Sequence, residues 1–419
     1  MRLRVAFAGI GVAAVALVVS AASRKEPDVL LWIDDASTVE RDTGERTVAF
    51  AVRASRRDGR ATVAFATSDG TASARRDYAA SAGSLVFDSG TTMRTVKVRV
   101  VGDTFDELDE TFRVSLSGAS GATIADAAAV GTIRDDDGRP LAGVHVAAAG
   151  DVACDPESDA FEGGRGQGLE CRQRATSDLL LRKRYAAVLA LGDLQYEDAT
   201  RAKFGASYDP SWGRLRSITR PVPGNHEYRT DGADGYFGYF GVVAGDPAKG
   251  YYSYDLGGWH LVALNSSCSE VGGCGAGSPQ ERWLRADLAA SSAPCTLAYW
   301  HHPRFSSGPH GSDLSYADFW RALYEAGADV VLVGHDHDYE RFAPQTASGG
   351  LALVRGMREF VVGTGGKGLR PFSTTRPNSE ARTATSLGIL ELTLGRDAYA
   401  WRFRAAVGSF RDRGSAPCH

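Results

Sequence analysis

The sequence feature that most constrains the fold is an apolar run that ends in a pair of histidines. Residues 328–333 read as a buried strand, and Gly334-His335-Asp336-His337 follows directly. Two histidines two positions apart on extended backbone project toward the same side. Neutral imidazole is the commonest metal ligand, so the pair can serve one metal or two. A single His-x-His also fits a surface loop, and the rest of the chain must decide between these interpretations.

Several other apolar runs also end in Asp, Asn or His. Such repetition is hard to assign to chance, although any one Gly-Asp is also common in ordinary turns. The runs and the polar residues that follow them are 144–149 with Gly150-Asp151, 186–191 with Gly192-Asp193, 221–223 with Gly224-Asn225, 260–264 with Asn265, and 296–300 with His301-His302-Pro303.

Helical patterns alternate with these strands over residues 144–409. We expect helices over 176–184, capped by Thr176 or Ser177, over 279–288 with Pro279 in the first turn, and over 318–326. This alternation is typical of a layered α/β fold. The polar loops fall at strand C-terminal ends, where such folds place their binding sites.

The residue types in these loops indicate a metal centre. A carboxylate that bridges two metal ions is the simplest use of a central Asp. Two metals about 3.5–4 Å apart suit phosphate-ester hydrolysis, because they lower the pKa of a water and clamp phosphate oxygens. The candidate ligands are Asp151, Asp193, Asn225, His301, His335 and His337.

The motif order resembles the calcineurin-like metallophosphoesterase superfamily, and more narrowly the purple acid phosphatases, over about residues 144–400. Gly192-Asp193-x-x-Tyr196, Gly224-Asn225-His226-Glu227, His301-x-Pro303 and Gly334-His335-x-His337 carry the resemblance. Asp151 lacks the usual Asp-x-His partner, and Tyr196 would replace that histidine. The resemblance implies a first metal on Asp151, Asp193, Tyr196 and His337, and a second on Asp193, Asn225, His301 and His335.

The resemblance also implies a mechanism and an activity. His226 would contact phosphate and protonate the leaving oxygen, with Glu227 orienting it. His310 would contact substrate, although a mobile loop is an equal alternative. Independently of the resemblance, His302 follows His301 on extended backbone and should point the other way, which favours a structural role. We expect a small phosphate monoester as substrate, attacked by a metal-bound hydroxide, with Fe(III) and a divalent Zn, Mn or Fe as the metals. The alternatives are a phosphodiesterase of the same fold and a calcium-dependent adhesion protein with a silent phosphatase domain.

Residues 28–137 alternate like an all-β protein. Short Val- and Thr-rich runs separated by turns such as Ser68-Asp69-Gly70 predict a β-sandwich. The order Ser68-Asp69-Gly70, Arg76-Asp77-Tyr78 and Gly131-Thr132-Ile133 resembles a Calx-β domain. That family can bind calcium at one end of the sandwich; an inert spacer is the alternative. The matching acidic positions are Glu40, Asp77, Asp106, Glu107, Asp109, Glu110, Asp135, Asp136 and Asp137.

The full prediction is therefore a layered metallophosphoesterase sandwich of mixed sheets flanked by helices, over residues 140–419, preceded by an all-β Calx-β-like sandwich. Residues 1–23 begin with a basic stretch, continue as an apolar run and end in small residues, which predicts a secretory signal rather than an uncleaved anchor. We find no other membrane span. The net charge of −4, without a basic block, gives no nucleic-acid-binding signature.

The six cysteines fit an exported chain with disulfides. Spacing does not fix their pairing. We favour Cys268 with Cys274, which enclose a Gly-rich loop, together with Cys154–Cys171 and Cys295–Cys418. A structural zinc site is the competing interpretation, but the chain lacks paired Cys-x-x-Cys motifs.

Overall fold

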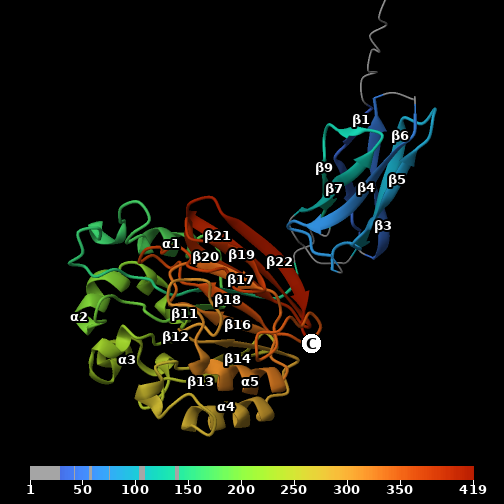
Figure 1. Ribbon diagram of the computed structural model, residues 1–419. Helices are drawn as coiled ribbons and strands as arrows, with labels where there is room; N and C mark the ends of the chain where they lie inside the picture. The colour runs from blue at the N-terminus through green and yellow to red at the C-terminus, as the bar shows by residue number, and fades with distance from the viewer. Residues whose placement is uncertain (1–28, 42, 56–58, 75, 103–108, 137–140) are drawn as a thin grey trace, which may run out of the picture.

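The computed structural model describes residues 29–41, 43–55, 59–74, 76–102, 109–136 and 141–419. The described chain forms two parts, a small all-β part at the N-terminus and a larger α/β part (Figure 1). Each part has its own hydrophobic core, and no residue belongs to both. In the part of the chain that the structure describes, no helix is both long enough and apolar enough to cross a membrane.

The N-terminal part is the predicted sandwich of two sheets. One sheet has the order β6-β3-β1-β8 and the other β2-β9-β7-β4-β5. Alternate residues such as Val48, Phe50 and Val52 point inward and are buried, which is the period-two pattern of the sequence. The strands are β1 Leu30–Ile33, β2 Ala36–Val39, β3 Gly44–Ala54, β4 Ala61–Asp69, β5 Ala82–Phe87, β6 Met93–Gly102, β7 Glu110–Ser120, β8 Thr123–Ile124 and β9 Ala128–Arg134.

The larger part packs a six-stranded sheet, ordered β12-β11-β10-β20-β21-β22, against a seven-stranded sheet, ordered β13-β14-β15-β16-β18-β17-β19. The six-stranded sheet contains β10 Val144–Ala149, β11 Ala187–Leu191, β12 Thr219–Val222, β20 Leu387–Leu394, β21 Ala398–Val407 and β22 Arg411–Pro417. The seven-stranded sheet contains β13 Tyr252–Leu256, β14 Trp259–Ala263, β15 Cys295–Tyr299, β16 Val330–Val333, β17 Tyr339–Phe342, β18 Arg358–Val362 and β19 Ser379–Thr383.

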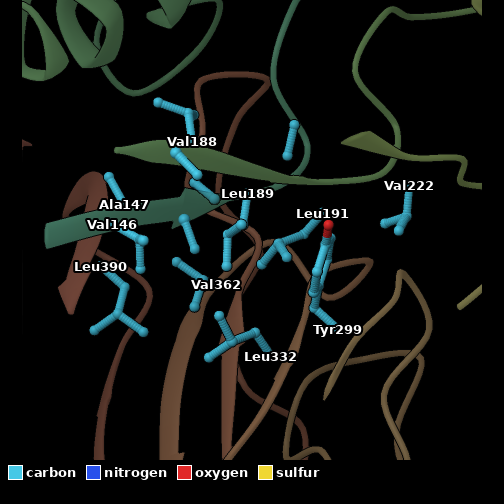
Figure 2. Close-up of a cluster of buried hydrophobic side chains, with 14 of the residues drawn as sticks. Val146, Ala147, Val188, Leu189, Leu191, Val222, Tyr299, Leu332, Val362 and Leu390 are labelled. Carbon is cyan, nitrogen blue, oxygen red and sulfur yellow. The ribbon is translucent and has the colours of Figure 1, made fainter. Parts of the chain in front are cut away.

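The main core lies between these two sheets. Figure 2 shows side chains from both sheets meeting, among them Val188 and Leu390 from one sheet and Leu332 and Val362 from the other. The central strands β14, β15 and β16 of the seven-stranded sheet are covered on both faces, so they read as continuous apolar runs rather than alternating ones.

Helices cover the outer faces. α4 Pro279–Ala290 and α5 Ala317–Glu325 pack Leu284, Phe319 and Trp320 on the seven-stranded sheet. α1 Gln173–Leu180 contacts β20 and β21 of the other sheet, while the short α2 Arg201–Lys203 and α3 Asp234–Phe240 contact each other.

The α1 boundary corrects the expected helix over 176–184. The helix begins earlier, at Gln173, and neither Thr176 nor Ser177 caps it. Instead, the Thr176 hydroxyl donates to the Gly365 carbonyl at 2.5 Å, which ties the first turn of the helix to a distant loop. The Thr176 hydroxyl, which we expected to cap the helix, therefore makes a tertiary contact instead. The helices predicted at 279–288 and 318–326 are confirmed within two residues.

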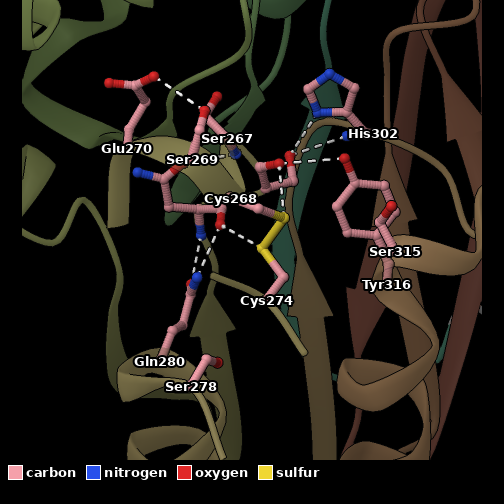
Figure 3. Close-up of a disulfide and its surroundings, with 12 residues drawn as sticks. Ser267, Cys268, Ser269, Glu270, Cys274, Ser278, Gln280, His302, Ser315 and Tyr316 are labelled. Atoms are coloured by element: carbon pink, nitrogen blue, oxygen red, sulfur yellow. Dashed lines mark hydrogen bonds between the residues drawn. A yellow bond between two sulfur atoms is a disulfide. The ribbon is translucent and has the colours of Figure 1, made fainter. Parts of the chain in front are cut away.

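All three favoured disulfides are confirmed. Cys154–Cys171, Cys268–Cys274 and Cys295–Cys418 are bonded, and no described cysteine is free. The last pair joins the start of β15 to the C-terminal residues over 123 positions. Figure 3 shows that Cys268–Cys274 lies beside His302 and Tyr316, in the loop that follows β14.

Candidate metal centre

The predicted site residues lie at one edge of the two packed sheets. β10, β11 and β12 are parallel to one another, as are β14, β15, β16 and β18, so their C-terminal ends bring the motif loops together. Main-chain hydrogen bonds link the loops: Asp151 N donates to Gly192 O at 3.1 Å, and Gly334 N donates to His301 O at 2.8 Å. Gly150 N donates to Val362 O at 2.9 Å and so connects the two sheets.

The glycines of the motifs are needed for close approach. A Cβ on Gly192 would lie 2.7 Å from the His301 ring, and one on Gly224 would lie 2.3 Å from Asp193 Oδ1. Three ligand candidates adopt left-handed backbone, with φ of 58° at Asp151, 48° at Asp193 and 70° at His335. Such conformations cost free energy in non-glycine residues and persist where the surroundings enforce them, which is typical of functional sites.

The four candidates for the first metal converge on one point. The Tyr196 hydroxyl lies 2.7 Å from Asp151 Oδ1, 3.2 Å from Asp193 Oδ2 and 3.1 Å from His337 Nε2. His337 Nε2 lies 3.3 Å from Asp151 Oδ1. Asp151, Asp193, Tyr196 and His337 are all buried, so their donor atoms face one another rather than solvent.

The candidates for the second metal adjoin this group through Asp193. His301 Nε2 lies 3.2 Å from Asp193 Oδ2 and 3.3 Å from His335 Nδ1. The Asn225 Oδ1 atom is buried and has no hydrogen-bond partner in the structure. Asp193 therefore stands between the two groups, in the position that a bridging ligand requires.

The electrostatics of the site are set by two buried carboxylates and the imidazoles beside them. Burial acts to raise the pKa of Asp193, but the His301 and His226 imidazoles outweigh it and the pKa is lowered. Burial lowers and Asp193 raises the pKa of His301, with a net value of about 9. Burial and the carboxylates of Asp151 and Asp193 raise the pKa of the Tyr196 phenol well above 10.

These observations fit two metal ions. Among the described residues, no lysine or arginine forms an ion pair with Asp151 or Asp193. Buried carboxylates without a cation are costly, and an orphaned buried amide oxygen adds to that cost. Metal ions would relieve both. The carboxylates of Asp151 and Asp193 together with His301 form a group whose ligand atoms lie within 4.8 Å of one another, and His301, His302 and His335 form another.

His226 lies beside the first group, with its ring 4.2 Å from that of Tyr196. Because a carbonyl can only accept, His226 Nδ1 donates to Glu197 O at 2.5 Å. Its Nε2 atom is left facing the site, 3.8 Å from Asp193 Oδ2.

The expected role of Glu227 in orienting His226 is wrong. The Glu227 carboxylate instead accepts from the main-chain N–H groups of Asp193 and Leu194, both at 2.9 Å, and of Gly224 at 2.7 Å. It is fully buried and shapes the loop that carries Asp193. Burial and the Asp193 charge raise the pKa of Glu227 to about 7.

His310 packs at the other side of the site. Its ring lies 4.1 Å from that of His335, and Asp336 Oδ1 accepts from its Nδ1 at 2.9 Å. This fixed position fits the substrate-contacting alternative.

The expectation that His302 points away is wrong. Its ring lies 4.3 Å from that of His335. Ser266 Oγ accepts from the His302 backbone N–H at 3.2 Å and lies 2.8 Å from its Nδ1 (Figure 3). The loop after β14 thus holds His302 in place, because backbone geometry beyond His301 departs from a simple strand.

Sequence reasoning missed the loop that follows β18. Gly363-Thr364-Gly365-Gly366-Lys367-Gly368-Leu369-Arg370 begins at a strand end, which was the available signal. Lys367 N donates to Asp151 O at 2.9 Å, and Arg370 N donates to His337 O at 3.0 Å. The Lys367 ammonium lies 4.9 Å from the centre of the Tyr196 ring and 2.6 Å from Glu197 Oε1.

Several calcium candidates gather at one end of the sandwich. Asp135 N donates to Asp109 Oδ1 at 3.3 Å, and Asp77 and Glu110 line the same cavity as Asp109. Asp136 Oδ1 accepts from Arg41 N at 2.9 Å, and Glu40, which precedes Arg41 in the sequence, is buried. Asp106, Glu107 and Asp137 lie outside the described residues. Calcium binding stays a prediction.

Comparisons with known proteins agree with this architecture. Residues 26–137 match the model of the Calx-beta domain, and residues 144–339 match that of the calcineurin-like phosphoesterases. The chain therefore contains a segment of the calcineurin-like phosphoesterase family behind an N-terminal Calx-beta domain, and this segment is similar to the purple acid phosphatases.

Individual relatives cover part of the chain. Purple acid phosphatase 18 of Arabidopsis thaliana is 28% identical over 250 residues, which is 54% of this chain and 55% of that protein. Acid phosphatase type 7 of Homo sapiens is 28% identical over 234 residues, 47% of this chain and 52% of that protein. The chain therefore matches about half the length of these relatives. The structure of purple acid phosphatase PPD1 from yellow lupin seeds has the same fold, with a TM-score of 0.54 at 15% identity, covering 91% of this chain and 73% of that one.

Proposed function

We propose that this chain is an exported phosphatase that hydrolyses phosphate monoesters at a centre of two metal ions. The observation that carries the proposal is the unbroken contact path from Tyr196 through Asp151 and Asp193 to His301 and His335, with separations of 2.7–3.3 Å. The proposed first metal ligands are Asp151, Asp193, Tyr196 and His337, and the proposed second ligands are Asp193, Asn225, His301 and His335.

When bound, the metals would supply an activated water and positive charge for the phosphate oxygens. The residues of the chain perform the remaining tasks. His226 presents Nε2 to the ester from beside Asp193, where it can deliver a proton to the leaving oxygen. Glu227 holds the main chain of the Asp193 loop, and His310 sits against His335 where the alcohol part of the ester would lie.

Phenolate binding at Tyr196 favours a strongly acidic cation in the first site, for which Fe(III) is suited, and the imidazoles of the second site favour a divalent Zn, Mn or Fe ion. Three disulfides support export, since such bonds persist in oxidising compartments. We place the boundary between the two domains at about residues 137–140, in keeping with the two family matches.

The test is the Asp193→Ala variant. Because the carboxylate serves both metals, we expect the variant to lose most bound metal, measured by elemental analysis, and all measurable turnover of 4-nitrophenyl phosphate. Asp246→Ala is the matched control, since that carboxylate is half exposed and lies near Lys249 at 3.4 Å. A folded Asp193→Ala protein that keeps two metals and normal turnover would reject the site. Turnover of bis(4-nitrophenyl) phosphate above the monoester would favour the diesterase instead.

A further inference from the structure

Two arginines stand at the rim of the metal centre without a carboxylate partner. Arg370 Nη1 lies 3.1 Å from His310 Nε2. Arg376 lies beside the loop that carries His310: its Nη2 would be 3.4 Å from a Cβ on Gly311, and its Nε donates to Ser306 O at 3.1 Å. Both side chains are exposed. No carboxylate of the described residues lies within 4.0 Å of either guanidinium.

Two other cations near the site do have a carboxylate partner. Lys367 Nζ lies 2.6 Å from Glu197 Oε1, and Arg229 Nη1 lies 3.5 Å from Glu197 Oε2. Those two cations therefore have a carboxylate and are largely neutralised. Among the described residues, Arg370 and Arg376 differ from them in having no carboxylate within ion-pair distance.

The hydrogen bonds at His310 hold Arg370 in a defined place. A carboxylate only accepts, so His310 Nδ1 donates to Asp336 Oδ1, and in the neutral ring Nε2 is an acceptor for Arg370. The His310 ring lies 4.1 Å from that of His335, a proposed ligand of the second metal. The guanidinium is thus one side chain away from the metal centre, and its other N–H groups remain available for a ligand.

We propose that Arg370, supported by Arg376, is a specificity-determining residue that binds a second phosphate group on the substrate. This inference rests on the proposed function, in which the metals hold the phosphate that is hydrolysed. The Arg370 guanidinium lies one side chain farther from the metal centre than His310, so it would meet the alcohol part of the ester. Its planar fork matches phosphate geometry, and no carboxylate of the chain competes for it. The preferred substrates are therefore phosphate monoesters whose alcohol part carries another phosphate.

The experiment compares two esters that differ only in the second phosphate, propyl phosphate and propane-1,3-diyl bisphosphate, in the metal-loaded full chain. We expect kcat/KM to favour the bisphosphate by about tenfold or more, the factor that a charge-assisted hydrogen-bond pair provides. Arg370→Gln should lose about tenfold on the bisphosphate and less than about threefold on propyl phosphate. Arg370→Lys should keep part of the preference, because it retains the charge but not the fork. Added salt should reduce the preference in the native protein, since the rim is solvent-exposed.

Arg402→Gln is the matched control, because Arg402 is exposed on β21, outside the strand-end loops, and also has no carboxylate within 4.0 Å among the described residues. It should leave both esters unaffected. An equal loss on both esters in Arg370→Gln would overturn the inference, because Arg370 would then act through His310. The absence of a preference for the bisphosphate in the native protein would also overturn it.

A binding measurement separates this inference from the proposed function. Propane-1,3-bisphosphonate and propylphosphonate cannot be hydrolysed, and calorimetry gives their affinities for the native protein and for Arg370→Gln. If neither ester is turned over but the bisphosphonate binds tighter in an Arg370-dependent way, the phosphatase proposal fails and the recognition site stands. If the esters are hydrolysed but Arg370→Gln leaves the affinity ratio unchanged, the recognition site is rejected and the phosphatase proposal stands.

Discussion

At the scale of single residues, Tyr196 is the basis of a prediction about the first metal. Its hydroxyl lies 2.7 Å from Asp151 Oδ1, and burial next to the carboxylates keeps the phenol protonated unless a cation removes the proton. Ferric iron removes such a proton well, and zinc or manganese(II) much less so. We expect Fe(III) there, with a visible phenolate charge-transfer band in the purified protein.

Tyr196→Phe should bleach this band and weaken the first metal while leaving the fold intact, because the ring keeps its packing against His226. Absorption spectra and metal analysis check the result. A colourless native protein that contains only zinc or manganese and is fully active would reject iron but keep the two-metal centre.

His226 gives a prediction about the reaction itself. With Nδ1 donating to Glu197 O, the Nε2 atom is the one that can reach the ester. His226→Ala should keep both metals and lose phosphatase rate by about 10²–10⁴-fold, as expected for a general acid. The loss should be smaller for aryl esters with acidic leaving groups, which need less protonation. A loss that is uniform across leaving groups would indicate phosphate binding instead.

Residue types and motif spacing predicted which side chains meet at the site, because glycine-flanked motifs at strand ends leave few alternatives. They did not predict the contacts of the residues that follow the proposed ligands in sequence. Glu227 binds main-chain N–H groups rather than His226, and His302 turns toward His335. Both outcomes depend on loop conformations, with partners such as Ser266 that are distant in sequence. Arg370 could not be chosen among many arginines without the β18 loop in place.

At the scale of elements, β14 is joined to its neighbours by a partly buried ion pair. His260 on β14 lies 2.9 Å from Asp287 of α4 and 2.9 Å from Asp255, its cross-strand partner on β13. His260 therefore links β13, β14 and α4 through its two ring nitrogens. The Asp287 hydrogen bond raises the pKa of His260 against the effect of burial. Burial acts to raise the pKa of Asp287, but its hydrogen bonds lower it.

This pair predicts a pH dependence of stability. A raised histidine pKa stabilises the fold fully below the unfolded value of about 6.5, and the gain disappears as pH rises through the folded pKa. The lowered pKa of Asp287 contributes stability above about pH 3.9, and this contribution is lost as the pH falls through the pKa of Asp287 in the folded state. His260→Gln should therefore cost about 1–2 kcal/mol near pH 6 and clearly less at pH 9, by urea denaturation. An unchanged difference between these pH values would show that His260 contributes packing rather than charge.

Elements themselves were largely predictable where burial dominates. The central strands β10, β11, β14, β15 and β16 are short apolar runs that are almost wholly buried, and this pattern predicts their type. The start of α1 was misplaced because Thr176 bonds to Gly365, 189 positions away, and such a contact gives no local signal.

At the scale of the whole molecule, the two parts have separate cores and meet through charged side chains. Arg413 lies 3.5 Å from Asp135, and Arg76 lies 3.8 Å from Glu380. The two arginine side chains keep 30% and 28% of their surface exposed, and ion pairs whose cation stays partly solvated contribute little stability. The two parts should therefore unfold as separate units, and calorimetry of the full chain should show two transitions.

Calcium should act on only one of these transitions. If the acidic end of the sandwich, which includes Asp77, Asp109 and Asp135, binds calcium with a Kd of about 0.1–1 mM, 10 mM calcium adds about 1–3 kcal/mol by mass action. For a domain of about 100 residues this raises Tm by several degrees. Magnesium at the same concentration is the control, since the smaller ion demands stricter geometry. The metal centre lies in the other part, so its transition should stay in place. If calcium does not shift the sandwich transition, the inert-spacer alternative is favoured. A single merged transition would show that the contact between the two parts couples them more strongly than ion pairs alone allow.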